Sequence, residues 1–238
     1  MASPAVVLAE AVAMPGDLVG FLLSGLLIGF CMSIALLVVK FDSKSLGSLR
    51  LEIARKIVHI GVSNWFFIYY YCFQTIVWPI VGLGAFAVLN FVLTLNGTYG
   101  AVLGTSQAKR SWGVVYYPLA VILLLVLLEL GVGSKVDVGC GLLGMGYGDG
   151  LAALVGLKFG TKKLFKGSKK TVAGSVTMML VVALIVFALK SVYGACSWGL
   201  FGWSLVVGLV SSVSEAVTPL GLDNISVPVV VFLMAALV

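Results

Sequence analysis

Charged residues are scarce in this chain of 238 residues. They make up 10% of the sequence, against about 25% in an ordinary soluble domain. Hydrophobic residues make up 61%. A soluble protein of this length needs much more polar surface to cover its core. The scarcity of charge therefore excludes an ordinary soluble domain and indicates a protein embedded in a membrane.

Histidine and cysteine are also scarce, with one histidine, His59, and four cysteines. The cysteines show no CxxC spacing, which argues against a zinc site and favours small packing residues. The 15 Lys and Arg residues give a net charge of +6. They are divided among short segments between apolar runs and lack interleaved aromatic residues, so the pattern argues against nucleic-acid binding.

Long apolar runs are abundant. A helix needs about 20 apolar residues to cross the hydrocarbon core of a bilayer. We predict an all-α, polytopic membrane helix bundle with seven to eight transmembrane helices. No linker, low-complexity run or repeat divides the chain, so we expect a single integral membrane domain over residues 1–238. The candidate spans, of which the last two are short, are residues 18–39, 57–73, 76–95, 112–130, 136–157, 172–189, 198–213 and 226–238.

The basic residues predict the orientation of this bundle. If the predicted spans alternate in direction, all but two of the 15 Lys and Arg residues, Lys135 and Lys190, fall on one side. Basic residues accumulate in the cytoplasmic loops of membrane proteins. We therefore predict that the N-terminus lies outside and that the basic side faces the cytoplasm.

Asp149 lies inside the fifth predicted span, in the glycine-rich segment 144–153. A carboxylate deep in a bilayer costs about 2.5–3.5 kcal/mol on insertion scales, so such groups usually face a wet cavity, a cation or a polar partner. The glycines themselves are typical of surfaces on which neighbouring helices pack closely. We predict packing for the glycines and a functional site for Asp149, with a simple hydrogen bond across the bundle as the alternative.

A lysine-rich loop precedes the sixth predicted span. Lys169, Lys170 and Thr171 stand directly before that span, and Gly174 and Ser175 follow within its first turn. A helix N-terminus offers free N–H groups and a positive dipole end to a phosphate, and lysine and hydroxyl side chains add donors. The spacing is not that of a Walker A loop. Nucleotide-phosphate binding and attraction to anionic lipid head groups both stay open.

Arg55, Lys56 and His59 form a cluster at the start of the second predicted span. Offsets of three and four residues place them on one face of a helix. Neutralisation of a phosphoryl group by Arg55 and Lys56, with His59 orienting a group or relaying a proton, is the functional interpretation. The alternative is structural, with basic side chains that extend from the span end toward water.

Hard oxygen ligands gather between the last two predicted spans. Glu215, Asp223 and Asn224 lie there without a basic residue nearby in sequence, and they are of the kind that Mg²⁺ binds. A solvated turn is the alternative, because Pro219 and Gly221 lie in the same segment.

These four clusters share one side of the predicted bundle. Phosphoryl transfer consists mainly of positioning and of charge neutralisation by Mg²⁺ and Lys or Arg, and a membrane location indicates a lipid acceptor. We therefore expect one polar pocket that opens both to the cytoplasm and to the bilayer. A transporter with a midplane site is the alternative, although the polar groups gather at one face and no repeat is visible.

Four motifs resemble those of the CTP-dependent lipid-alcohol kinases. That family includes dolichol, phytol and farnesol kinases and the yeast-type diacylglycerol kinase, and it is related to the phosphatidate cytidylyltransferases. The last two motifs are most similar to the phytol-kinase branch. The motifs are Arg55-Lys-Ile-Val-His59, Gly148-Asp-Gly-Leu-Ala152, Lys169-Lys-Thr-Val-Ala-Gly-Ser175 and Asp223-Asn-Ile-Ser-Val-Pro228.

The resemblance implies transfer of the γ-phosphate of CTP, with Mg²⁺, to the hydroxyl of a membrane lipid alcohol such as phytol or another prenol. A diacylglycerol kinase and a CDP-lipid synthase are the alternatives, and the second lacks its His-Gly-Gly…Asp-Arg signature here. Asp149 would be a metal ligand or the general base. The remaining expected roles are catalytic for Arg55, Lys56 and His59, nucleotide binding for Lys169, Lys170, Thr171, Gly174 and Ser175, and metal binding for Glu215, Asp223 and Asn224.

Overall fold

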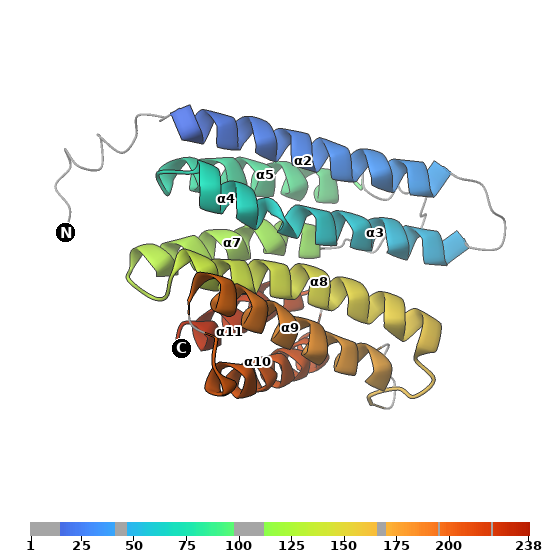
Figure 1. The fold of residues 1–238 in the computed structure, drawn as a ribbon. Coiled ribbons are helices and arrows are strands. Elements are labelled where there is room, and N and C mark those ends of the chain that lie inside the picture. The colour runs from blue at the N-terminus through green and yellow to red at the C-terminus, as the bar shows by residue number, and fades with distance from the viewer. Residues whose placement is uncertain (1–14, 41–46, 98–111, 166–169, 195, 220) are drawn as a thin grey trace.

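The computed structural model describes residues 15–40, 47–97, 112–165, 170–194, 196–219 and 221–238 (Figure 1). Within these ranges the protein is helical and contains no strand; one isolated bridge joins Lys163 to Thr171. The predicted all-α fold is confirmed for the described residues. The helices are α2 (Pro15–Lys40), α3 (Gly47–Ser63), α4 (Trp65–Cys72), α5 (Val77–Leu95), α7 (Gly113–Glu129), α8 (Lys135–Phe159), α9 (Val172–Tyr193), α10 (Trp198–Val217) and α11 (Asp223–Ala235).

Five of the described helices, α2, α5, α8, α9 and α10, are long and apolar enough to cross a membrane. The apolar helices α7 and α11 are shorter, at 17 and 13 residues. The span expected at 198–213 is longer in the structure, because α10 extends to Val217 and reaches 20 residues. The fold is therefore that of a polytopic membrane bundle with five full-length apolar helices among the described residues.

The span predicted over 57–73 is instead two helices, α3 and α4, with Asn64 between them. The Asn64 side-chain amide donates to the backbone carbonyl of Ile60, and so does the Ser63 hydroxyl. Such local side-chain bonds compete with the helical hydrogen-bond ladder. The apolar run at 57–73 therefore does not form one continuous helix.

Helix α8 lies at the centre of the bundle, where it packs against α3, α9 and α11. Its N-terminal half is almost entirely buried. Ser134 begins the helix with a capping box, since its hydroxyl accepts from the Asp137 N–H while the Asp137 carboxylate accepts from the Ser134 N–H. This arrangement satisfies N–H groups that a helix start leaves unpaired.

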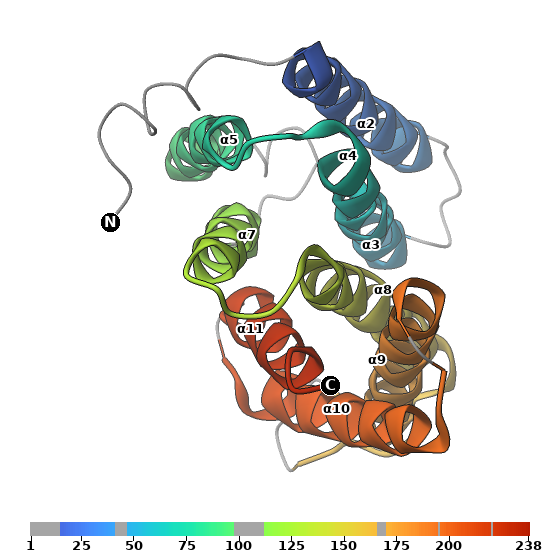
Figure 2. The same cartoon turned by 60° about the vertical axis from the view of Figure 1, so that its left-hand side comes forward.

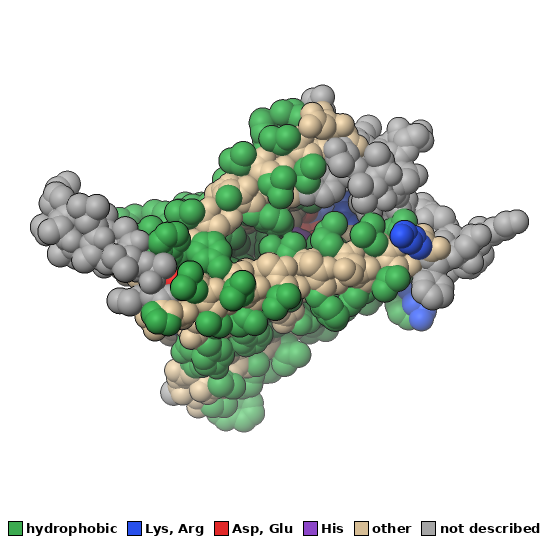
Figure 3. Space-filling model, turned by 90° about the horizontal axis from the view of Figure 1, so that it is seen from above, with side chains coloured by type: hydrophobic (Ala, Val, Ile, Leu, Met, Phe, Trp, Pro, Cys, Tyr) green, Lys and Arg blue, Asp and Glu red, His purple; other side chains and the backbone are tan. Residues whose placement is uncertain are grey.

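The outward surface is apolar. On α2 the side chains of Leu22, Leu26 and Phe30 are exposed by 70%, 69% and 65%, and hydrophobic side chains cover much of the face shown in Figure 3. A soluble protein would bury such side chains, whereas a bilayer solvates them. In the view turned by 60°, α2 to α5 lie on one side of the bundle and α7 to α11 on the other (Figure 2).

Candidate active site

Close packing of α3 on α8 positions the first part of the site. Gly146 and Gly150 face α3: a Cβ at Gly146 would overlap the side chain of Ser63, and one at Gly150 would lie 2.5 Å from Cγ1 of Ile60. Small residues allow membrane helices to approach at backbone distance. The packing role predicted for these glycines is thus confirmed, and it brings α3 against the turn of α8 that carries Asp149.

Lys56 and His59 of α3 both reach Asp149 of α8. The Lys56 ammonium lies 2.5 Å from Oδ2 of Asp149, and Nε2 of His59 lies 3.5 Å from the same oxygen. The three side chains are 6%, 15% and 16% exposed. Nε2 of His59 is buried and makes no hydrogen bond with the described residues. Asp149 is therefore a partly buried carboxylate with one cationic partner and a histidine beside it.

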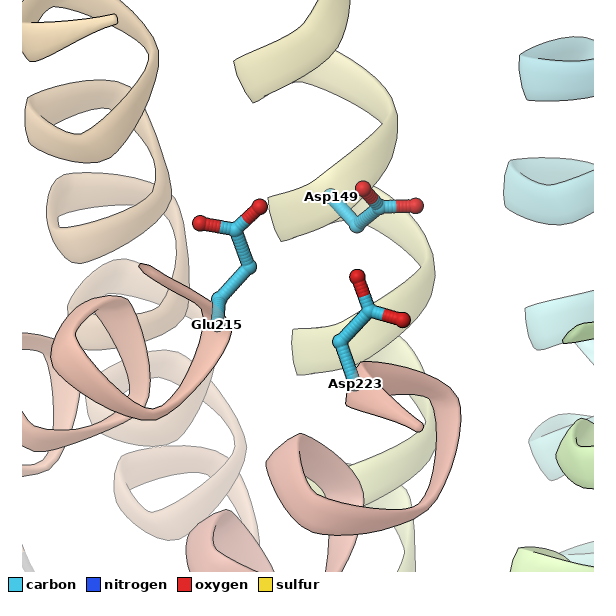
Figure 4. Close-up of side chains that lie close together, drawn as sticks. All are labelled: Asp149, Glu215 and Asp223. Carbon is cyan, nitrogen blue, oxygen red and sulfur yellow. The ribbon is translucent and has the colours of Figure 1, made fainter. Parts of the chain in front are cut away.

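Two further carboxylates approach Asp149 from other helices. Glu215 lies near the C-terminal end of α10, and Asp223 is the first residue of α11. One carboxylate oxygen from each of the three residues lies within 4.8 Å of the other two (Figure 4). Segments separated by up to 74 positions in sequence thus meet at one point, as the sequence predicted.

Lys170 enters the same cluster from the loop before α9. Its ammonium lies 2.6 Å from Oε1 of Glu215 and 3.7 Å from Oδ2 of Asp223, and it also donates to the backbone carbonyl of Glu215. The loop backbone is held by hydrogen bonds from the Leu164 N–H to the Lys170 carbonyl and from the Val172 N–H to the Lys162 carbonyl. This loop conformation directs the Lys170 side chain toward the carboxylates.

The carboxylate cluster, defined as Asp149, Glu215 and Asp223, gathers three acidic groups in a small space. Two ionised carboxylates within 4.8 Å of each other repel by about 3 kcal/mol or more at an effective dielectric constant of about 20. Among the described residues, the ammonium groups of Lys56 and Lys170 form ion pairs with the cluster. Carboxylate oxygens converging from three helices are a donor set that suits Mg²⁺.

The other residues predicted in this region lie around the cluster. Arg55 is 52% exposed and pairs with Glu52 at 2.6 Å, at the edge of the site. The Asn224 side-chain amide donates to Oδ1 of Asp223 and to the Gly221 carbonyl, so it orients Asp223. The roles predicted for Arg55 in charge neutralisation and for Asn224 in metal binding stay predictions.

The start of α9 contains the predicted nucleotide-binding residues. The Thr171 hydroxyl accepts from the Gly174 N–H and caps the helix. Gly174 lies against α8, because a Cβ there would lie 2.9 Å from the Ala152 carbonyl oxygen. The Ser175 hydroxyl is buried without a hydrogen-bond partner among the described residues. Lys169 lies outside the described residues.

Some residues near the site were not predicted. Tyr117 of α7 lies beside His59, with ring centroids 5.2 Å apart. Glu52 bridges Arg55 and Lys56, at 2.6 and 4.0 Å. Tyr117 occurs in an apolar run with no charged neighbour, so its sequence context resembles that of an ordinary packing aromatic. Glu52 could have been identified, since it lies three and four residues before the two cations.

Comparison with known proteins assigns the family. A phytol kinase of Synechocystis sp. is 31% identical over 188 residues, which cover 74% of this chain and 75% of that protein. The chain belongs to the phytol kinase family. This assignment agrees with the resemblance of the four motifs, all of which contribute residues to the region just described or to the loop beside it.

Other relatives of this phytol kinase family member are similar over different lengths. A chloroplastic phytol kinase of Arabidopsis thaliana is 28% identical over 231 residues, covering 84% of this chain and 71% of the relative. A dolichol kinase of the same plant is 37% identical over 102 residues, covering 41% of this chain and 17% of the relative. No protein-family profile and no solved structure matches the chain.

Proposed function

We propose that this member of the phytol kinase family transfers the γ-phosphate of CTP to the hydroxyl of a membrane isoprenoid alcohol, with Mg²⁺ as cofactor. The observation that carries the proposal is the carboxylate cluster, three carboxylates from three helices within 4.8 Å, contacted by two lysines. Clustered metal ligands and cations are the groups that phosphoryl transfer requires. The relatives named phytol kinase and dolichol kinase support the reaction class.

Asp149, Glu215 and Asp223 would hold the magnesium ion, with Asn224 keeping Asp223 oriented. A magnesium ion held by these residues would supply positive charge that neutralises the nucleotide phosphates during transfer. Two lysines, Lys56 and Lys170, would bind the nucleotide phosphates. Lys56 and Lys170 now contact carboxylates, and each would contact phosphate oxygens when nucleotide binds. Lys169 and the start of α9 would extend this phosphate-binding surface.

His59 would act on the lipid hydroxyl. Its Nε2 faces Asp149 at 3.5 Å, an arrangement in which the carboxylate orients the ring and Nδ1 accepts the hydroxyl proton. Long contacts of this kind in a ligand-free enzyme shorten when substrate binds. The lipid oxygen would attack the γ-phosphorus while the bond to the β-phosphate oxygen breaks. The products are the lipid monophosphate and CDP.

We further propose that the site faces the cytoplasm and that the N-terminus lies outside. Helices α2 and α8 run in the same direction in Figure 1 and end in Lys40 and in Lys158-Phe159. Basic residues accumulate on the cytoplasmic side of membrane proteins. Modification of a cysteine introduced by Lys163→Cys, tested from each side of sealed vesicles, would establish this orientation.

The test of the proposed function is a label-transfer assay with purified protein in detergent. The protein is incubated with Mg²⁺, with γ-labelled CTP or ATP, and with a panel of prenols and diacylglycerol. Label should move from the γ-position of CTP to a prenol. A parallel reaction with α-labelled CTP should leave the lipid unlabelled, because a CDP-lipid synthase alone would transfer the α-phosphate. Labelled lipid in the α-reaction, or no lipid labelling in either, would contradict the proposal.

A further inference from the structure

An apolar cavity of about 380 Å³ lies between α2, α3, α4, α5, α7 and α8. Helix α2 packs on α3 and α4, and α5 packs on α7, so α2 and α5 form opposite walls of this cavity. Figure 3 shows a hollow whose floor includes Lys or Arg, Asp or Glu, and His side chains. The lining residues include Phe21, Gly25, Leu83, Phe86, Tyr117 and Leu142.

Tyr117 connects the apolar cavity to the polar site. It lines the cavity, its ring lies 5.2 Å from that of His59, and the residue is 8% exposed. Its hydroxyl is buried and has no hydrogen-bond partner among the described residues. Buried hydroxyl groups are normally paired. An unpaired hydroxyl between a hydrocarbon-like cavity and a histidine is therefore placed to pair with the hydroxyl of a bound molecule.

We propose that this cavity holds the hydrocarbon tail of the lipid alcohol, with the tail entering from the bilayer between α2 and α5 and the lipid hydroxyl lying at Tyr117 and His59. This inference rests on the proposed function and adds the position and size of the acceptor. The volume lies within the range of about 300–1,000 Å³ that is typical of ligand pockets.

The volume also selects among lipid acceptors. An apolar cavity of about 150 Å³ binds benzene, so about 25 Å³ per carbon is a workable scale, and 380 Å³ would enclose roughly 15 carbons on that scale. A single isoprenoid tail fits, and a longer one would project between α2 and α5. The two acyl chains of a diacylglycerol would not both fit.

Gly25 offers a direct test, because it lines the cavity and a Cβ there meets nothing within 4 Å. Gly25→Phe should fill the cavity. Gly29→Phe is the matched control: Gly29 lies one turn later on α2, is equally open and does not line the cavity. We expect Gly25→Phe to raise the KM for a C15 prenol by about tenfold or more, to leave the KM for CTP unchanged, and to spare a C5 prenol.

Tyr117→Phe tests the hydroxyl contact without changing the shape of the cavity. It should lower kcat/KM for prenols of every length by about tenfold, as expected when one hydrogen bond to a substrate hydroxyl is lost. Equal kinetics for Gly25→Phe and Gly29→Phe, in an active enzyme, would overturn the cavity assignment while leaving the kinase function intact.

A binding experiment separates this inference from the proposed function. A C15 prenol that carries a diazirine at its tail end is photolysed with wild-type protein, and the labelled peptides are mapped. Labelling within residues 21–28 and 82–89 that excess prenol prevents, and excess phosphatidylcholine does not, would support the inference even in a protein without kinase activity. Labelling elsewhere, or equal competition by phosphatidylcholine, would overturn it.

Discussion

The ammonium of Lys56 lies 2.5 Å from Oδ2 of Asp149, although 93 positions separate the two residues in sequence. Both side chains are largely buried, at 6% and 16% exposure. This ion pair links α3 to the central helix α8 at the point where the other carboxylates converge. Removal of one partner of a buried pair leaves an uncompensated charge and costs about 3–5 kcal/mol.

Lys56→Met should therefore lower both activity and stability. We expect turnover to fall about 100-fold or more, and the melting temperature to fall because Asp149 loses its cation. The double variant Lys56→Met/Asp149→Asn should recover stability but not activity, since the buried charge is gone as well.

Thiol labelling of buried Cys140 during heating would measure unfolding. Arg55→Met, which breaks an exposed pair, is the control and should change stability by about 1 kcal/mol or less. A double variant no more stable than Lys56→Met would contradict the pairing.

Lys170→Gln should weaken nucleotide binding. The ammonium contacts Glu215 and Asp223, beside the proposed phosphate position, so its loss should raise the KM for CTP by about tenfold and lower kcat if the contact strengthens in the transition state. Lys163→Gln in the same loop removes an equal charge from an exposed residue. Equal effects of the two variants would show that the loop contributes only its overall charge.

Glu215→Gln and Asp223→Asn should weaken binding of a divalent cation. Both carboxylates belong to the cluster, and each lost ligand charge should raise the Mg²⁺ concentration needed for half-maximal activity. Mn²⁺ titration followed by electron paramagnetic resonance measures the same site without turnover. The variants should bind Mn²⁺ about tenfold or more weakly than wild type, in line with the effects of changing groups around a metal. Unchanged Mn²⁺ affinity in both would argue against a metal site here.

Gly150→Ala should disturb the contact between α3 and α8. The new methyl group would lie 2.5 Å from Cγ1 of Ile60, and overpacking of this kind costs about 1–3 kcal/mol. We expect lower thermal stability and lower activity, because the same contact positions Lys56. Adding Ile60→Ala should restore much of both. Gly202→Ala on α10, where nothing lies within 4 Å of the added Cβ, should have no adverse effect. Failure of the double variant to recover would show that Gly150 acts in another way.

The sequence predicted the helical class and the convergence of the four motifs because both follow from strong patterns. A carboxylate inside an apolar span needs a polar or cationic partner group. The alternating direction of the spans restricts which segments can supply that partner. The break at Asn64 was not predicted, since it depends on side-chain bonds to the Ile60 carbonyl. The direct contacts of Lys170 with Glu215 were not predicted, because the alternation of spans indicates a shared side of the bundle but not which side chains touch.

The most direct test of the kinase mechanism compares Asp149→Asn with Asp17→Asn in the transfer of label from γ-labelled CTP to a prenol. Both substitutions remove one largely buried carboxylate charge without changing its shape. Asp17, in the first turn of α2, accepts from the backbone N–H of Gln74 between α4 and α5 and does not belong to the carboxylate cluster. Asp149→Asn should lose about 100-fold or more of the transfer rate, measured on folded protein because this substitution also leaves buried Lys56 without its carboxylate partner, and Asp17→Asn should keep its activity. Near-wild-type transfer by Asp149→Asn would contradict the mechanism.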